Sequence, residues 1–290
     1  PIIGSPKTTY YRNKLEYTFC NKRFLTREEI ANGQDIDRTP AVGFHVPGLF
    51  DKVIDIKKCY LQAEPSNAVR NFIRDYAIEH ELSFYDIREQ AGFLRTLIIR
   101  TSSTGEVMVI VTFGEENRED REGLLNAIVQ QFPEITSLMY VINEKMNDTI
   151  TDQEVICFHG NDHIFEQMED LKFKIGPKSF YQTNSEQAYN LYAKTRELAG
   201  LTGNETVYDL YTGTGTIAQM LAPVASKVVG VEIVEEAVEA AKKNAVDNHL
   251  DNCEFIAGDV LKVVDNLTQK PDILVLDPPR DGIHPKALRK

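Results

Sequence analysis

The segment Asp209-Leu-Tyr-Thr-Gly213-Thr-Gly215-Thr216 carries residue types that could hold a small charged ligand. It follows an apolar stretch typical of a β-strand and precedes a stretch with helical periodicity. Glycines allow the backbone to approach a ligand closely. In parallel sheets, ligands bind in the crevice at the carboxyl ends of the strands. A tight turn in an α/β domain without a ligand would explain the glycine pair equally well. The function of this loop is therefore judged from the polar residues that end the other strands.

Polar residues follow the next three expected strands as well. Glu232 ends the second strand, where an acid can accept hydrogen bonds from ribose hydroxyls. Asp259 follows the third, where a carboxylate can face an adenine amino group. Asp277-Pro-Pro-Arg280 ends the fourth, and its two prolines fix a rigid loop that cannot pair as a strand. Polar signals at four successive strand ends favour a bound nucleoside over a plain turn.

Two cofactor classes fit the glycine loop. A nicotinamide dinucleotide remains open, because Ala218 occupies the third position of the dinucleotide fingerprint and Glu232 suits its ribose. Asp209 argues against it, because a carboxylate at the strand end would repel a pyrophosphate. The same carboxylate would attract the ammonium and sulfonium groups of S-adenosylmethionine. The sequence therefore favours S-adenosylmethionine and leaves the dinucleotide as the minor alternative.

The elements around these residues alternate between strand and helix from about residue 170, which predicts right-handed βαβ units and a parallel sheet. We expect strands at 171–175, 206–211, 228–233, 253–256 and 273–277. Helices are expected from Thr183, with Glu186 completing a capping box, from Thr216, and over 235–248 and 261–267. The runs Val-Val-Gly-Val and Ile-Leu-Val-Leu predict strands buried on both faces. Strand 273–277 reads as a central strand, so we expect further strands beyond Lys290.

Residues 1–175 predict an α+β domain, and residues 176–290 an α/β domain with a parallel sheet incomplete at its C-terminus. In the first domain a hairpin turn is expected at Ser103-Thr104-Gly105. Antiparallel strands with helices on one face would explain the order of its elements. Its expected strands are 10–19, 41–45, 53–57, 94–100, 107–113, 138–142 and 155–159, and its expected helices are 67–81 and 118–131.

The bulk properties describe a globular chain of 290 residues, of which 42% are hydrophobic. No apolar run is long enough to predict a membrane span, and the start of the chain has no apolar core of a signal peptide. It does not begin with Met, so processing or a fragment is expected. Four scattered cysteines suggest neither a disulfide scaffold nor a complete zinc site, and they fit a reducing cytoplasm.

The net charge of −12 argues against a protein that coats nucleic acid non-specifically. Residues 1–27 nevertheless hold six basic residues and one acid. This cluster is interpreted either as an RNA-contacting patch or as a solvated strand face, with equal support for each. The RNA-contacting interpretation rests on Arg12, Lys14, Lys22 and Arg23.

Together these motifs resemble the RNA (uracil-5-)-methyltransferases over nearly the whole chain. The resemblance lies in Phe180-Tyr-Gln182-Thr-Asn184, the glycine loop, Val229-Gly-Val-Glu232 and Asp277-Pro-Pro-Arg280. Tyr11-Arg-Asn-Lys14 is similar to the opening of the family's central RNA-contacting domain. The resemblance implies a Rossmann-like class I methyltransferase domain that uses S-adenosyl-L-methionine. The residues that it places around the cofactor and target base are Gln182, Tyr211, Thr216, Glu232, Asp259 and Asp277.

The family's chemistry implies a cysteine thiolate that adds to uracil C6, methylation at C5, and removal of the C5 proton by a base. The family's nucleophile and base lie beyond its Asp-Pro-Pro-Arg motif, so this chain is expected to lack both. Asp277 is expected to hold the pyrimidine edge or the cofactor, and Arg280 the surroundings of the base or a phosphate. Cys59 resembles the fourth ligand of the [4Fe-4S] cluster in cluster-bearing members, whose other ligands are expected only in a longer parent.

The resemblance of Cys59 to that ligand implies ribosomal RNA of the large subunit as substrate, since many cluster-bearing members act on it, with transfer RNA as the alternative. Two other functions remain open. Asp-Pro-Pro-x loops also hold amino groups, so an amino-group RNA methyltransferase is the alternative enzyme. The non-enzymatic alternative is an inert fragment that binds cofactor or RNA. No membrane or protein partner is expected.

Overall fold

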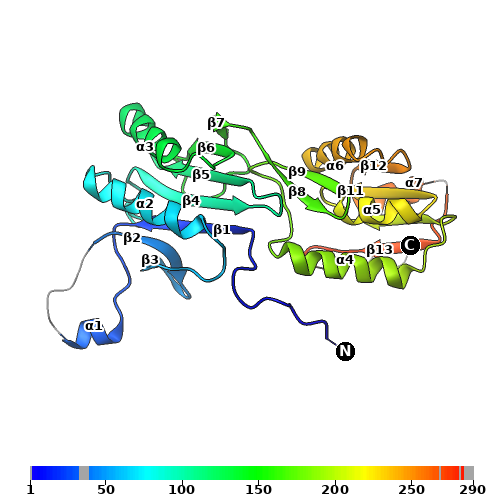
Figure 1. The fold of residues 1–290 in the computed structure, drawn as a ribbon, viewed down its shortest axis with the longest axis horizontal. Coiled ribbons are helices and arrows are strands. Elements are labelled where there is room, and N and C mark those ends of the chain that lie inside the picture. The colour runs from blue at the N-terminus through cyan, green and yellow to red at the C-terminus, as the bar shows by residue number, and fades with distance from the viewer. Residues whose placement is uncertain (1, 33–38, 268, 281, 284–290) are drawn as a thin grey trace. The chain divides into compact units, whose positions relative to one another are not determined.

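The computed structural model describes residues 2–32, 39–267, 269–280 and 282–283, and it divides the chain into two compact units (Figure 1). Unit 1 comprises Pro1–Ile164 with Gly176–Lys178, and unit 2 comprises Phe165–Ile175 with Ser179–Lys290. Residues 165–175 pack with the second unit, whereas the sequence analysis placed them in the first domain. No helix of the described residues is both long and apolar enough to cross a membrane.

Unit 1 is built on a seven-stranded sheet with the order β3-β2-β1-β4-β5-β6-β7. All neighbouring strands are antiparallel except β5 and β6, which are parallel because helix α3 connects them. The bounds are β1 Lys14–Cys20, α1 Arg27–Asn32, β2 Ala41–Val46, β3 Leu49–Asp55, α2 Ser66–Glu79, β4 Leu94–Thr101, β5 Val107–Phe113, α3 Arg118–Gln131, β6 Ser137–Ile142 and β7 Ile156–Gly160.

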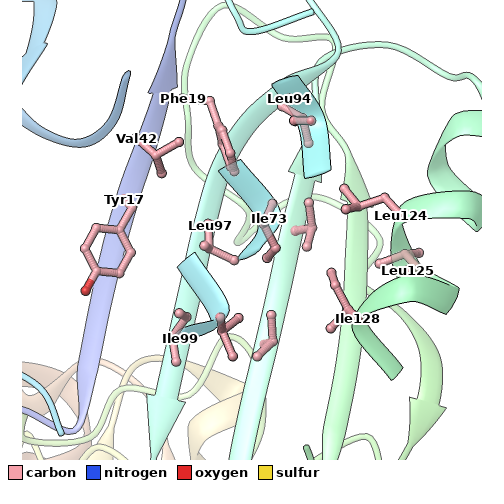
Figure 2. Close-up of a cluster of buried hydrophobic side chains, with 14 of the residues drawn as sticks. Tyr17, Phe19, Val42, Ile73, Leu94, Leu97, Ile99, Leu124, Leu125 and Ile128 are labelled. Carbon is pink, nitrogen blue, oxygen red and sulfur yellow. The ribbon is translucent and has the colours of Figure 1, made fainter. Parts of the chain in front are cut away.

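Helices α2 and α3 lie side by side on one face of this sheet, as the sequence predicted (Figure 1). Ile73 of α2 and Leu124, Leu125 and Ile128 of α3 pack onto apolar side chains of the strands, among them Leu97 (Figure 2). All five are fully buried. Burial of such a side chain stabilises the fold by about 1.5–3 kcal/mol. The shared core therefore fixes both helices on the sheet.

Unit 2 contains a four-stranded parallel sheet with the order β12-β11-β10-β13 and a two-stranded hairpin of β8 and β9. The parallel sheet and the Rossmann-like alternation of its elements confirm the predicted fold class. The bounds are β8 Ile164–Met168, β9 Leu171–Ile175, α4 Ser185–Ala199, β10 Thr206–Leu210, α5 Thr216–Leu221, the 3-10 helix η1 Ala222–Val224, β11 Lys227–Glu232, α6 Glu235–Asp247, β12 Cys253–Ala257, α7 Val260–Asn266 and β13 Ile273–Leu276.

Strand β9 is attached to helix α6 by two asparagines one helical turn apart. Asn244 accepts a hydrogen bond from the amide of Lys174 at 2.9 Å. Asn248 accepts one from the amide of Lys172 at 2.8 Å and donates one to its carbonyl at 2.9 Å. These side chains satisfy backbone groups of β9 as a neighbouring strand would.

Two local expectations in unit 2 are wrong. Helix α4 does not start from Thr183, because Asn184 is its N-cap and accepts a hydrogen bond from the amide of Gln187 at 3.0 Å. Strand β13 is not buried on both faces either. Leu274 and Leu276 are 50% and 41% exposed, and among the described residues β13 pairs with β10 alone.

Candidate functional site

Asp209 lies within β10 and is fully buried at the base of the glycine loop. Its Oδ2 accepts hydrogen bonds from the Thr212 hydroxyl at 2.6 Å and from the Ala218 amide at 3.1 Å. Its Oδ1 is buried without a hydrogen-bond partner among the described residues. Burial raises the pKa of Asp209, the two hydrogen bonds oppose this, and the carboxylates of Asp277 and Glu232 add to it, so that the pKa is raised to about 7. A cation placed at Oδ1 would find a buried acceptor already oriented by the loop.

The loop itself turns through residues with left-handed backbone conformations. Tyr211, Gly213 and Gly215 have φ values of +69°, +56° and +77°. A Cβ at Gly213 would meet nothing within 4 Å, so the chain is open there. A Cβ at Gly215 would lie 2.7 Å from the ring of Phe255. Gly215 therefore serves conformation and packing, whereas Gly213 leaves space beside the loop where a ligand could approach.

Glu232 ends β11 and is joined to the loop by its carboxylate. Oε2 accepts a hydrogen bond from the Gly213 amide at 3.0 Å. Oε1 accepts from the amides of Ile233 and Val234 at 2.8 and 3.0 Å. A carboxylate offers about four acceptor positions, so Oε2 retains one for a ligand hydroxyl. The residue predicted to hold a ribose thus also fixes the glycine loop.

Asp259 lies next to Glu232 through a backbone contact, because the amide of Gly258 donates to the carbonyl of Glu232 at 2.8 Å. Asp259 is the N-cap of α7, and its Oδ1 accepts from the Leu261 amide at 2.9 Å. Thr216, the first residue of α5, is buried. The structure therefore brings the acids of three successive strands around one glycine loop.

Gln182 and Asp277 are connected to this group through Tyr192, a buried residue of α4. The Gln182 side chain is hydrogen-bonded to the Tyr192 hydroxyl. Burial raises the pKa of Tyr192, and the nearby carboxylates of Asp277 and Asp209 raise it further. Asp277 and Arg280 themselves are exposed after β13. Tyr192 and Thr212 carry no signal in the sequence, because a tyrosine in a helix and a threonine in a turn are ordinary.

The four basic residues predicted to contact RNA lie at opposite ends of β1. Arg12 and Lys14 lie at its start, and burial together with the Arg100 charge lowers the pKa of Lys14. Lys22 and Arg23 follow its end. Seven extended residues span roughly 20 Å, so the cluster in the sequence is two separate groups in space.

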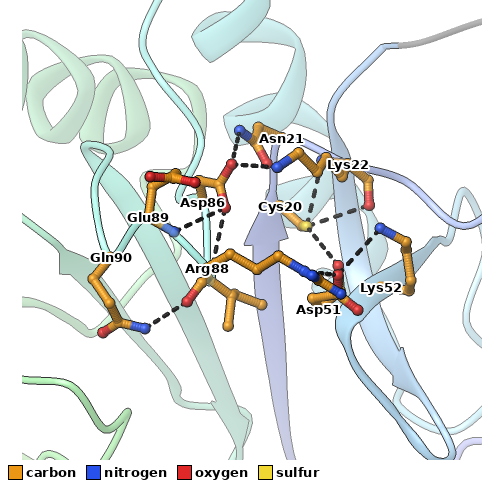
Figure 3. A network of polar contacts seen from close by, with 10 residues as sticks. Cys20, Asn21, Lys22, Asp51, Lys52, Asp86, Arg88, Glu89 and Gln90 are labelled. Atoms are coloured by element: carbon orange, nitrogen blue, oxygen red, sulfur yellow. Dashed lines mark hydrogen bonds and ion pairs between the residues drawn. The ribbon is translucent and has the colours of Figure 1, made fainter.

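Lys22 and Arg23 are engaged in ion pairs within the chain. Lys22 Nζ lies 2.6 Å from Asp86 Oδ2, and Arg23 lies 2.7 Å from Glu29 (Figure 3 shows the first pair). Hydrogen bonds from Lys22 and Asn21 hold the pKa of Asp86 well below its ordinary value. These contacts support the solvated-strand interpretation for this half of the cluster, because each charge is already balanced.

Cys59 is buried in unit 1, in the loop between β3 and α2. Within the described ranges, no three His, Cys, Asp or Glu side chains gather as a metal site. A four-iron cluster needs several thiolate ligands, and Cys59 supplies one. The described residues therefore supply at most one ligand of such a cluster.

A family model, two curated relatives and one solved structure are similar to this chain. Residues 201–284 match a family model described as a methyltransferase domain. An uncharacterized RNA methyltransferase of Bacteroides thetaiotaomicron is 57% identical over 98% of this chain, and one of Clostridium tetani is 40% identical over 99%. The chain spans 64% and 61% of the lengths of these relatives.

A solved structure extends the likeness to the fold. The tRNA (uracil-54, C5)-methyltransferase of Pyrococcus abyssi, in complex with S-adenosyl-L-homocysteine, is 28% identical and superposes with a TM-score of 0.77. The match covers 98% of this chain and 64% of that one. The residues at the strand ends thus lie in a methyltransferase domain, within a chain whose curated relatives are named RNA methyltransferases.

Proposed function

We propose that unit 2 binds S-adenosylmethionine at the carboxyl ends of β10, β11 and β12, and that the protein methylates uracil at C5 in RNA. The observation that carries the cofactor assignment is the Oδ1 of Asp209, which is buried without a hydrogen-bond partner in the described part of the chain, together with the open space at Gly213 in the same loop. A cationic ligand would relieve the cost of this buried carboxylate, whereas a pyrophosphate would increase it. When bound, the cofactor supplies a methyl group activated by a sulfonium.

Each side chain has a distinct role in this proposal. Asp209 attracts the cationic end of the cofactor, Glu232 accepts a ribose hydroxyl through the free position of Oε2, and Asp259 accepts from the adenine amino group. Gln182, oriented by Tyr192, lines the site with Tyr211 and Thr216. Hydrogen bonding to these fixed acceptors would hold the cofactor, and with it the methyl group, in one orientation.

Asp277 and Arg280 are proposed to act on the RNA, because they are exposed beside the cofactor residues. Asp277 would accept from the N3–H of the target uracil, and Arg280 would contact a phosphate of its backbone. The uracil must leave its stack to reach them. The nucleophilic cysteine and the general base are proposed to belong to the part of the relatives' length that this chain does not span.

Uracil C5 as the methylated position is supported by the Pyrococcus abyssi enzyme, which is named a tRNA (uracil-54, C5)-methyltransferase. For the substrate we propose ribosomal RNA, following the resemblance of Cys59 to a cluster ligand. The transfer-RNA alternative has the support of the same solved structure. The two substrates are distinguished by comparing how fast one protein preparation methylates ribosomal RNA and transfer RNA at equal RNA concentration.

The cofactor site is tested by calorimetric titration of S-adenosylmethionine at pH 7 in buffers of different ionisation enthalpy. Because the pKa of Asp209 is about 7, a cation at its carboxylate should release about half a proton per site. Asp209→Asn should weaken binding and abolish this proton release. Asp272→Asn is the matched control, because Asp272 accepts from the Thr206 amide at the opposite end of the strands. Equal binding and proton release in all three proteins would overturn the role of Asp209.

The reaction is tested with a labelled methyl group and uridine-containing RNA, for this chain and for the full-length Bacteroides thetaiotaomicron relative. The expected product of the relative is 5-methyluridine, and RNA containing 5-fluorouridine should form a covalent complex with it. A product methylated on nitrogen, without the covalent complex, would establish the amino-group alternative. Cofactor binding without turnover by both proteins would instead identify a binding protein.

A further inference from the structure

Two segments of unit 1 that are distant in the sequence form one basic, aromatic surface. The amide of Tyr10 donates to the carbonyl of Tyr60 at 2.7 Å, and the amide of Arg12 donates to that of Leu61 at 2.8 Å. These contacts hold residues 10–12, in the segment 1–14, beside residues 60–61, in the segment 56–62 that leads into α2. The two segments together contain five basic residues and no acidic residue, in a chain whose net charge is −12.

Two tyrosine rings are exposed on this surface, which we call the Tyr10–Tyr60 platform. The side chains are 41% and 54% exposed, and their ring centroids lie 6.0 Å apart. Lys58 Nζ lies 5.1 Å from the centroid of the Tyr60 ring. Exposed aromatic faces beside cations are the feature by which proteins bind unpaired bases and their phosphates.

The platform is held by the core beneath it. Asn67, which is buried, accepts a hydrogen bond from the Cys59 amide at 2.6 Å and donates one to the Cys59 carbonyl at 3.1 Å. This pair fixes the residue between Lys58 and Tyr60. Tyr10 has a φ of +54°, which is uncommon for a residue with a side chain. The rings are therefore presented by fixed backbone, so ordering them costs little on binding.

We propose that the Tyr10–Tyr60 platform binds unpaired bases of the RNA substrate by stacking, with Lys58 contacting the adjacent phosphate. This inference rests on the proposed action on RNA and names a contact surface for it. The charge complementarity selects a polyanion, and the exposed ring faces select one with accessible bases. It moves the expected RNA contacts of unit 1 from Lys22 and Arg23, whose charges are balanced, to the opposite end of β1.

The test measures binding of a fluorescein-labelled oligouridine to the whole chain by fluorescence anisotropy, over a series of salt concentrations. Loss of stacking is worth at least about 1 kcal/mol per base, so Tyr60→Ala should weaken binding about fivefold or more. Tyr60→Phe retains the ring and should bind within twofold of the parent. The slope of log K against log salt is negative, and Lys58→Gln should reduce its magnitude by about 0.7, whereas Tyr60→Ala should leave it unchanged.

Phe50 provides the matched control. It is 66% exposed, and the Arg88 guanidinium lies 5.8 Å from its ring, but Arg88 Nε is paired with Asp51 at 2.5 Å (Figure 3). Phe50→Ala should therefore leave RNA binding within twofold of the parent. An equal effect of Phe50→Ala and Tyr60→Ala would overturn the platform, as would equal losses in Tyr60→Ala and Tyr60→Phe.

Calorimetry with S-adenosylmethionine on the same proteins separates the two proposals. Intact cofactor binding by Tyr60→Ala, with weakened RNA binding, supports the platform. Intact cofactor binding with unchanged RNA binding, or no RNA binding by the parent chain, overturns the platform alone. Absent cofactor binding by the parent chain overturns the proposed cofactor site, whatever the RNA result.

Discussion

Asp209→Asn should make the glycine loop more stable, relative to the parent chain, as the pH rises. The folded chain raises the pKa of Asp209 from 3.8 to about 7, so between these values the folded state holds a proton that the unfolded state has lost. The stability of the parent chain contributed by this group is therefore complete below pH 3.8 and falls as the pH rises towards 7. The asparagine side chain does not titrate, so the variant escapes this loss.

The size of the effect follows from the pKa shift. One pKa unit corresponds to about 1.4 kcal/mol, and the folded parent carboxyl is already half ionised at pH 7, so the advantage of the variant should grow by about 2 kcal/mol between pH 5 and pH 7. The asparagine oxygen can still accept from Thr212 and Ala218, which keeps the loop geometry. Its amide group takes the place of Oδ1. Because that group carries no negative charge, the carboxylates of Asp277 and Glu232 do not repel it as they repel the parent carboxylate.

The assay is hydrogen–deuterium exchange of peptides covering residues 206–222, which reports the free energy of local opening. Comparing variant and parent at the same pH cancels the intrinsic pH dependence of exchange. Glu205→Gln is the control with a pKa shift of opposite sign, because hydrogen bonds from Thr202 lower the pKa of Glu205 to about 2. The stability from that group is present above its unfolded pKa and is lost as the pH falls towards 2. A variant–parent difference for Asp209→Asn that stays constant from pH 5 to pH 7 would refute the reasoning.

Three further substitutions test the packing around the glycine loop and the Tyr10–Tyr60 platform. Gly215→Ala should destabilise the chain by roughly 2–5 kcal/mol, because a Cβ there overlaps with Phe255 in addition to the cost of a left-handed backbone. Gly213→Ala should cost only about 1–2 kcal/mol, because a Cβ there meets no neighbour. Equal shifts in Tm for the two variants would contradict this distinction. Asn67→Ala removes both side-chain hydrogen bonds to Cys59 and should lower the free energy of local opening by roughly 2 kcal/mol. Hydrogen–deuterium exchange of peptides covering residues 56–62 measures this change. Unchanged exchange would refute the anchoring role of Asn67.

Hydrophobic periodicity was a sound guide to the strands that face one core. The alternating Leu171–Ile175 was predicted with the bounds that the structure has. Strand β8 was missed, because Glu166 occupies its buried central position and breaks the alternation. Glu166 is held there by the Ser185 hydroxyl at 3.0 Å, a contact between distant residues that no local pattern reveals.

Helix starts show the limit of short motifs. Two of the five Thr-x-x-Glu runs in the sequence precede a helix, at Thr26 and at Thr183. Of these two, only the first forms a capping box, with the Thr26 amide donating to Glu29 at 2.8 Å. At the second, Asn184 is the cap, because asparagine is the stronger N-cap residue and lies one position later. The prediction chose the second copy and missed the helix that follows the first.

The candidate cofactor residues were accessible to sequence reasoning because they follow consecutive strands of one parallel sheet. Parallel strands place their carboxyl ends at one edge, so spacing along the chain translates into proximity. The basic residues around β1 were not accessible in this way, because an extended strand carries neighbours in sequence far apart. Their ion pairs with Asp86 and Glu29 depend on segments that the pattern of β1 does not contain.

The ring of Phe255 lies against two glycines, and this has a consequence for how relatives of the chain can vary. A Cβ at Gly230 would lie 2.6 Å from that ring, as one at Gly215 would lie 2.7 Å from it. The three positions therefore share one volume and should change together during evolution. A relative with alanine at position 230 should carry a smaller side chain at position 255, whereas position 213 should vary independently of both.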